Sequence, residues 1–320
     1  MSRRTWTVFA AMCVIWGIPY LLIRVAVRDV PPGTLVFVRT AVGGLALAPF
    51  ALARGGFRPL VVRWRPLLAF AFIEMAIPWL ALSDAERHLS SSLTGLLIAA
   101  VPLMGVLVAW LTRSGERFEP LQLAGLTVGL VGVAMLVGLD FGQVSGPALL
   151  EVLVVVVCYA VGPVIMARYL AQLPGIPVAC ASLLAVALAY LPYALMRPPT
   201  HVPAQGWWAM AALAVVCTAL AFVLFFMLIA SIGPARATVI TYVNPAVAVL
   251  CGVLFLSEQL TLGILVGFPL ILVGSVLGAR KRNPDQSILT EPLAVSNTAA
   301  TTPVPSSGER QSTSMPSNGC

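Results

Sequence analysis

Two charged side chains lie deep inside apolar stretches of the sequence, where an ionisable group is most costly. Arg39 is six residues into the run 33–53, about 9 Å along a helix. Glu74 is eight residues past Pro66, about 12 Å along. A charge at the centre of a membrane helix costs roughly 2.5–3.5 kcal/mol on insertion scales. We expect Arg39 to hold an anionic group and Glu74 to carry a proton or bind a cation. The alternatives are an arginine that snorkels to the membrane surface and a carboxylate hydrogen-bonded to a neighbouring helix.

An amide and four aromatic side chains also lie inside apolar runs. Asn244 precedes Pro245, which removes one helical hydrogen bond, so the amide could contact a ligand, although bonding between helices is the stronger alternative. Packing is the ordinary role of each aromatic residue, but together they could line a cavity for an organic solute. These residues are Trp16, Trp79, Tyr159 and Tyr242.

Prolines inside the apolar runs are candidate hinges. Proline lacks the N–H group that a helix needs and clashes with the preceding turn, so it kinks the helix and frees a backbone carbonyl. The alternative is that these prolines only shape the packing between helices. The candidates are Pro19, Pro102, Pro163 and Pro245.

The elements that carry these residues follow from the composition. Of 320 residues, 59% are hydrophobic and 10% are charged, against about 25% charged in a soluble domain. Ten apolar runs approach the roughly 20 residues that cross a bilayer, and their lack of alternation favours helices. The sequence therefore predicts an all-α integral membrane protein with ten transmembrane helices. The runs are residues 6–27, 33–53, 66–82, 93–111, 121–139, 148–167, 178–196, 207–230, 235–256 and 260–279.

Basic residues between the runs predict the orientation. With the N-terminus in the cytoplasm, the cytoplasmic side collects 13 basic residues and the far side collects 3, and positive loops favour the cytoplasm. We expect a multi-pass protein of the plasma (inner) membrane with both termini cytoplasmic. Residues 283–320 are rich in Ser, Thr and Pro and should form a disordered cytoplasmic tail.

The two halves of the sequence match at a nearly constant offset of 142 to 144 residues, which indicates an internal repeat. Each half holds five runs, an odd number, so the second copy enters the membrane from the opposite face. We expect one repeat over residues 6–139 and an inverted one over residues 148–280. Such inverted repeats are typical of secondary transporters, in which two halves rock about a shared site. The glycines in this pattern predict close helix packing. Matching pairs include Pro19 with Pro163, Pro102 with Pro245, Gly125 with Gly267, and Gly132 with Gly274.

An ordered set of short motifs also runs along the chain: Trp16-Gly17, Phe37-Val38-Arg39, Leu93-Thr94-Gly95-Leu96-Leu97 before Val101-Pro102, Gly233-Pro234-Ala235-Arg236-Ala237, Tyr242-Val243-Asn244-Pro245, and Ser257-Glu258-Gln259-Leu260-Thr261. Over residues 7–280 the chain resembles the EamA-like family of the drug/metabolite transporter (DMT) superfamily. The resemblance implies ten transmembrane helices in two five-helix repeats and transport of small metabolites. The second repeat departs from the first by carrying Tyr159-Ala160 where the first carries Trp16-Gly17.

These features favour a secondary transporter that moves a small organic compound, such as an amino acid, metabolite or drug-like molecule, across the plasma membrane by alternating access, in the direction of efflux. Proton or counter-ion coupling fits Glu74. The alternative is a non-transport membrane protein, either an intramembrane enzyme or a scaffold. The sequence has no His-Glu-x-x-His motif, no mid-span pair of aspartates and no nucleotide-binding loop. We therefore expect no enzyme, cofactor, metal or nucleic acid, and leave the oligomeric state open.

Overall fold

Helices make up every regular element in the described part of the chain, as the apolar runs predict. The computed structural model describes residues 3–111, 120–138, 145–233, 237 and 240–278. Contacts divide the chain into the unit Met1–Arg280 and the unit Lys281–Cys320. The predicted tail, residues 283–320, lies outside the described residues, as does part of the motif that begins at Gly233.

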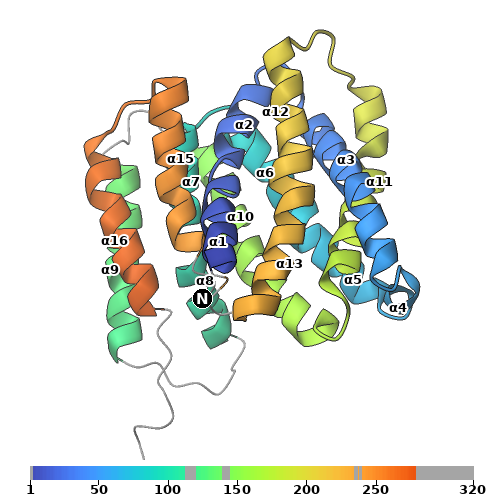
Figure 1. Ribbon diagram of the computed structural model, residues 1–320. Coiled ribbons are helices and arrows are strands. Elements are labelled where there is room, and N and C mark those ends of the chain that lie inside the picture. The colour runs from blue at the N-terminus through green and yellow to red at the C-terminus, as the bar shows by residue number, and fades with distance from the viewer. Residues whose placement is uncertain (1–2, 112–119, 139–144, 234–236, 238–239, 279–320) are drawn as a thin grey trace, which may run out of the picture. The chain divides into compact units, whose positions relative to one another are not determined.

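The first half of the described chain holds nine α-helices and one π-helical segment (Figure 1). They are α1 (Arg3–Ile15), α2 (Pro19–Ala26), α3 (Pro32–Ala53), α4 (Arg58–Val61), α5 (Trp64–Ala71), η1 (Phe72–Ala76), α6 (Ile77–Ala85), α7 (Ser91–Ile98), α8 (Val101–Leu111) and α9 (Pro120–Gly138).

The second half contains longer uninterrupted helices and two further π-helical segments. They are α10 (Gly146–Ile165), η3 (Met166–Leu170), α11 (Gly175–Met196), α12 (Ala204–Ala214), η4 (Val215–Leu220), α13 (Ala221–Ile232), α15 (Ile240–Leu256) and α16 (Leu262–Gly278).

Eight continuous or briefly interrupted helical segments are long and apolar enough to cross a membrane, which confirms an all-helical membrane protein at this level. The expected ninth and tenth runs are shorter helices, α15 and α16, of 17 residues each among those described. The eight segments are Arg3–Ala26, Pro32–Ala53, Trp64–Ala85, Ser91–Val108, Pro120–Gly138, Gly146–Leu170, Gly175–Met196 and Ala204–Ile232.

Proline explains where two of the predicted runs are interrupted. Pro19 is the first residue of α2, directly after the break that separates it from α1. Pro102 is the second residue of α8, after the break behind α7. A proline in the first turn of a helix has no N–H bond to lose, so a new helix begins there at little cost. Pro163 and Pro245 instead lie within α10 and α15.

Three of the membrane-spanning segments contain a π-helical segment that the apolar pattern did not reveal: η3 ends Gly146–Leu170, and the other two lie inside their segments. η1 lies within Trp64–Ala85, and η4 lies within Ala204–Ile232. A π turn holds an extra residue and occurs often at functional sites. η1 carries Glu74, and η4 carries Thr218.

Close packing of glycines joins the last long helix of each half. α9 and α16 lie side by side at the left of Figure 1 and make the most extensive contact between elements. A Cβ atom at Gly132 would lie 2.7 Å from the backbone nitrogen of Ile271, and one at Gly274 would lie 2.6 Å from the carbonyl oxygen of Gly125. The prediction that these glycines allow close helix packing is confirmed.

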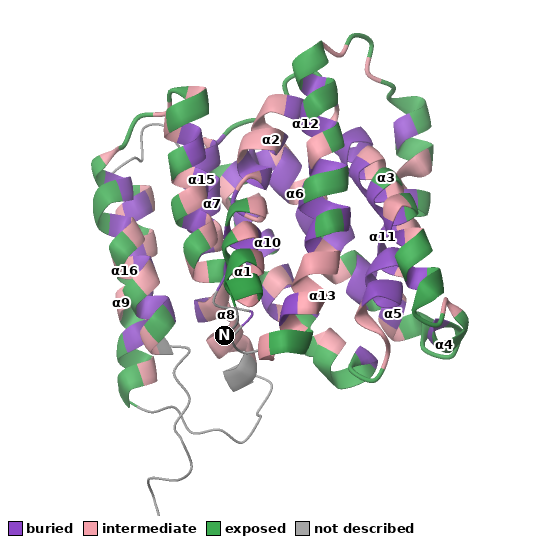
Figure 2. Ribbon diagram, viewed as in Figure 1, coloured by how far each residue is buried: buried purple, intermediate pink, exposed green. Residues whose placement is uncertain are grey.

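The remaining pairs bring the two halves of the chain together. α3 packs on α11, α6 on α10, α7 on α15, and α1 on α13. Buried positions face the interior of this bundle, whereas many exposed positions are large apolar residues (Figure 2). Leu188, Trp208 and Phe255 each expose at least 70% of their surface, as expected for side chains that meet lipid rather than water.

Candidate functional site

Arg39 is buried inside the bundle, where side chains from both halves of the chain contact it. It is only 8% exposed. Its Nε donates a hydrogen bond to Oγ1 of Thr218 at 3.0 Å, and its Cζ lies 3.7 Å from the centroid of the Trp79 ring. The guanidinium therefore has a hydrogen-bond partner from the second half and an aromatic partner from the first.

Thr218 is held in place by the π-helical segment η4. Its hydroxyl donates to the carbonyl oxygen of Leu213 at 2.8 Å, five residues earlier in the chain. The same oxygen accepts from Arg39, so this hydroxyl both donates and accepts a hydrogen bond. Sequence reasoning missed Thr218, because a single threonine in an apolar run gives no sign of its partner.

Two tyrosines extend the surroundings of Arg39. The hydroxyl of Tyr159, on α10, accepts a hydrogen bond from the indole N–H of Trp79. Tyr159 and Tyr20 both interact electrostatically with Arg39. Tyr20, on α2, is 8% exposed and was not singled out by the sequence. We refer to these five residues as the Arg39 site: Tyr20, Arg39, Trp79, Tyr159 and Thr218.

The positive charge of the Arg39 site has no carboxylate partner among the residues that the structure describes. Within the described residues the one salt bridge joins Arg87 to Asp84, at 3.1 Å, on the surface. The groups that interact electrostatically with Arg39 are Tyr159, Cys217 and Tyr20, all of which are ordinarily neutral at neutral pH. A buried cation without a counter-ion is costly unless a partner arrives. The arrangement suits recognition of an anionic group.

Glu74 lies next to this site, in the middle of its helix. Its Oε2 is enclosed and has no hydrogen-bond partner, and the carboxyl group packs directly against Gly162 of α10. Any Cβ atom at position 162 would collide with Oε2, so the glycine makes room for the acid. Glu74 interacts electrostatically with Tyr159. The structure thus brings four predicted residues into one neighbourhood: Arg39, Glu74, Trp79 and Tyr159.

The other three predicted site residues make contacts in a different part of the bundle. Trp16 packs on Phe225, with ring centroids 4.7 Å apart. Tyr242 donates to the carbonyl oxygen of Ser275 at 3.4 Å. With its amide nitrogen turned toward the backbone, Asn244 donates to the carbonyl oxygens of Cys13 at 3.1 Å and Ile240 at 3.0 Å. These contacts agree with the helix-bonding alternative for Asn244.

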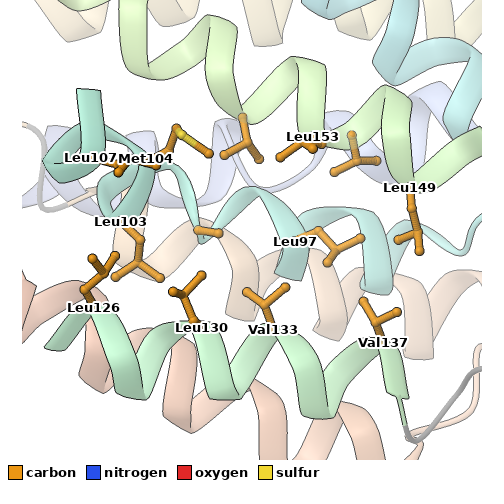
Figure 3. Close-up of a pocket in the computed structure, with 13 residues that line it drawn as sticks. Leu97, Leu103, Met104, Leu107, Leu126, Leu130, Val133, Val137, Leu149 and Leu153 are labelled. Atoms are coloured by element: carbon orange, nitrogen blue, oxygen red, sulfur yellow. The ribbon is translucent and has the colours of Figure 1, made fainter. Parts of the chain in front are cut away.

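Two cavities lie away from the Arg39 site. The one in Figure 3 has a volume of about 340 Å³ and is lined by aliphatic side chains of α7 to α10, with Leu130 and Val133 on one wall and Leu149 and Leu153 on the other. The second, of about 750 Å³, is lined in part by Arg63 and Tyr169. No group of three metal-ligating side chains occurs among the described residues.

The comparisons with known proteins agree with this architecture. The model of the EamA-like transporter family matches residues 5–138 and again residues 146–279. The chain is 30% identical to "Uncharacterized inner membrane transporter YedA" of Escherichia coli (strain K12), over 82% of this chain and 88% of that one.

Two further similarities concern an exporter and a solved fold. The chain is 27% identical to "Probable terminal-alkyne amino-acid exporter" of Streptantibioticus cattleyicolor, over 87% of this chain and 91% of that one. A protein known from its crystal structure has the same fold, with a TM-score of 0.62 at 22% identity, over 87% of this chain and 97% of that one. The resemblance seen in the sequence motifs is confirmed, and the chain belongs to the EamA-like transporter family.

Proposed function

We propose that this protein is a secondary transporter that exports a small organic metabolite across the plasma (inner) membrane by alternating access. The observation that carries this proposal is the Arg39 site, where a buried guanidinium lies between the two halves of the chain with no carboxylate partner in the described part. A carrier needs a site at this place, because a movement of one half against the other can then expose it to either side.

The architecture in this proposal is ten transmembrane helices in two inverted repeats, residues 6–139 and 148–280. Three observations support it. The family matches each half separately. The contacts between helices are also similar in the two halves. In the proposed repeat α10 corresponds to α1 and α6 corresponds to α13, and α10 packs on α6 as α1 packs on α13. The π segments η1 and η4 begin at Phe72 and Val215, 143 residues apart, which is the offset of the sequence repeat.

Each part of the site has a proposed task. Arg39 binds an anionic group of the substrate, and Trp79 and Tyr159 contact its organic portion. Glu74 carries a proton or binds a cation, and its carboxylate gains or loses charge as the site opens. The name of the Streptantibioticus relative supports an amino acid as the first solute to test.

The prolines and the orientation complete the proposal. Pro19 and Pro102 at helix breaks, and Pro163 and Pro245 inside helices, serve as hinges or kinks. Both termini face the cytoplasm, because that orientation places most loop arginines inside.

The test is counterflow in proteoliposomes that contain the purified full-length protein. Vesicles loaded with an unlabelled amino-acid mixture should take up the same mixture in radiolabelled form, with saturation and without chemical conversion. Vesicles with the Arg39→Ala protein are the control and should show little uptake. Conversion of the solute would favour an intramembrane enzyme. The absence of counterflow for amino acids and for a wider panel of organic anions would contradict the proposal.

A further inference from the structure

Two glutamates lie near the same end of the bundle but differ in their hydrogen bonding. Glu258, in the segment between α15 and α16, accepts bonds from both backbone nitrogens and both hydroxyls of Ser91 and Ser92, with the two nitrogens at 2.8 and 2.9 Å. Its carboxylate thus satisfies the free N–H groups at the start of α7. The structure gives Glu258 the role of a helix cap.

Glu86 is a carboxyl group that the structure leaves without any such bonds. It follows Ala85, the last residue of its membrane-spanning segment, and it is completely buried. Both Oε1 and Oε2 are enclosed and have no hydrogen-bond partner. Arg24 donates through Nη1 to the backbone carbonyl oxygen of Glu86 rather than to its side chain. A charged carboxylate cannot remain in such a place without a partner.

The charged and titratable groups around Glu86 come from two sides. Tyr20 and Arg24 approach from α2, and Glu258 approaches from the segment before α16. Burial, the largest cause, raises the pKa of Glu86 well above its ordinary value; Arg24 opposes this and Glu258 adds to it. The structure therefore favours the neutral acid at position 86.

A second group of charges lies close by in sequence. Arg87 pairs with Asp84 at 3.1 Å, and Asp84 also shares a hydrogen bond with Glu151 of α10. Arg87, Asp84 and Glu151 are not among the groups that shift the pKa of Glu86. The Asp84–Glu151 pair and Glu86 are therefore separate acidic sites.

Tyr20 connects Glu86 to the Arg39 site. It interacts electrostatically with Glu86, with Arg39 and with Tyr159, and it is 8% exposed. Tyr159 interacts in turn with Glu74. A series of ionisable side chains therefore runs from the end of α6 to the middle of the bundle: Glu86, Tyr20, Tyr159 and Glu74.

We propose that Glu86 is a proton-binding site of the transport cycle, distinct from Glu74 and linked to the Arg39 site through Tyr20. This inference rests on the proposed transport function. In the closed arrangement seen here, the carboxyl holds one proton. When this end of the bundle opens, the O–H bond of the Glu86 carboxyl breaks and the proton passes to water. Arg24 then donates to the Glu86 carboxylate instead of to the backbone carbonyl oxygen of Glu86. Closure requires one proton to return.

The first test uses the proton alone as the probe. The infrared spectrum of the full-length protein at neutral pH should contain a band from a protonated carboxyl, and this band should be absent from the spectrum of Glu86→Gln at the same pH. Glu74→Gln and Glu258→Gln are matched controls, since each also removes one carboxyl but should leave this band. Glu86→Asp should retain a protonated-carboxyl band, but the pH at which half of that band is lost should differ from that of the wild type. A neutral-pH band unchanged by Glu86→Gln would overturn the inference.

A stability measurement checks the same point without substrate. A group whose pKa is raised in the folded protein stabilises it below the ordinary carboxyl pKa of about 4.3 and loses that contribution as the pH rises toward the folded value. The wild-type melting temperature should therefore fall over this range more than that of Glu86→Gln. Glu86→Gln should match the wild type in acid and exceed it at neutral pH. Lower stability of Glu86→Gln at neutral pH would contradict the inference.

Transport measurements test the role of Glu86 separately from the proposed transport function on which it rests. Using the radiolabelled amino-acid mixture, Glu86→Gln should retain counterflow, which needs no net proton movement, but lose accumulation driven by a pH gradient by roughly tenfold or more. Equal pH-driven accumulation in Glu86→Gln and wild type would overturn the inference and leave the transporter intact. A wild-type protein without counterflow would instead remove the transport function itself, while the spectra still report on Glu86.

Discussion

Arg39 and Thr218 are 179 residues apart in the chain, yet Nε of Arg39 donates to Oγ1 of Thr218 at 3.0 Å. Because Thr218 belongs to η4, this bond joins α3 in the first half of the chain to the second half. A movement of the halves against each other must therefore break or replace it. An anionic substrate that binds the guanidinium would supply the replacement.

The first prediction concerns Arg39 itself. Arg39→Ala should weaken binding of an anionic solute by about 2–5 kcal/mol, the cost of truncating a buried charged hydrogen-bonding partner. It should change the thermal stability much less, because the guanidinium has no carboxylate partner to lose. Thr218→Val removes the hydrogen bond but leaves the charge of Arg39 in place, and it should lower the free energy of unfolding by about 1 kcal/mol. Solute binding and thermal unfolding are measured in parallel. Equal losses of binding and stability in Arg39→Ala would make the residue structural.

The second prediction concerns Glu74 and the glycine that faces it. Glu74→Gln should abolish uptake driven by a pH gradient, since the amide cannot exchange a proton. Gly162→Ala should also impair this uptake, because the new methyl group occupies the space of Oε2 and must displace the carboxyl. Gly105→Ala, where a Cβ atom meets nothing within 4 Å, is the control. Normal pH-driven uptake in Glu74→Gln would leave the residue with a packing role.

The third prediction tests the contact between α9 and α16. A Cβ atom at Gly274 would overlap the backbone of Gly129 and lie 2.6 Å from the carbonyl oxygen of Gly125. Backbone atoms cannot rotate away as a side chain can, so Gly274→Ala should destabilise the protein by about 1–3 kcal/mol. Gly105→Ala should be neutral or gain up to about 1 kcal/mol from helix propensity. Thermal unfolding in detergent measures both. Similar melting temperatures for the two variants would contradict the close packing.

The fourth prediction concerns the orientation in the membrane. Single cysteines that replace Arg58 and Arg197, each in a Cys320→Ser background, should react differently with a membrane-impermeant maleimide. In intact cells the probe should label Arg197→Cys and should reach Arg58→Cys only after the cells are opened. The native cysteines within the described residues are buried and should contribute little labelling. The reverse pattern would place both termini outside.

The sequence predicted the helices well because apolar run length is a direct physical requirement of the bilayer. Their ends differ from the structure by a few residues, as at Trp64–Ala85, where the predicted run was 66–82. The π segments were not foreseen, since an added residue in one turn leaves the apolar composition unchanged.

The site was predicted only in part. Arg39 and Glu74 stand out in sequence because charges in apolar runs are rare. Thr218 and Tyr20 do not, since their importance comes from contacts across the bundle. Glu86 escaped notice because it follows the apolar run and would ordinarily be a solvated loop residue, whereas packing of the neighbouring helices buries it completely.

The π segments also bear on how the helices rearrange. Shifting the extra residue of a π turn along its helix rotates the side chains it passes by about 100° while the hydrogen-bonded rod stays intact. Glu74 in η1 and Thr218 in η4 are both placed to turn in this way. The π segments would thus allow Glu74 and Thr218 each to reorient while the helix that carries it stays hydrogen-bonded.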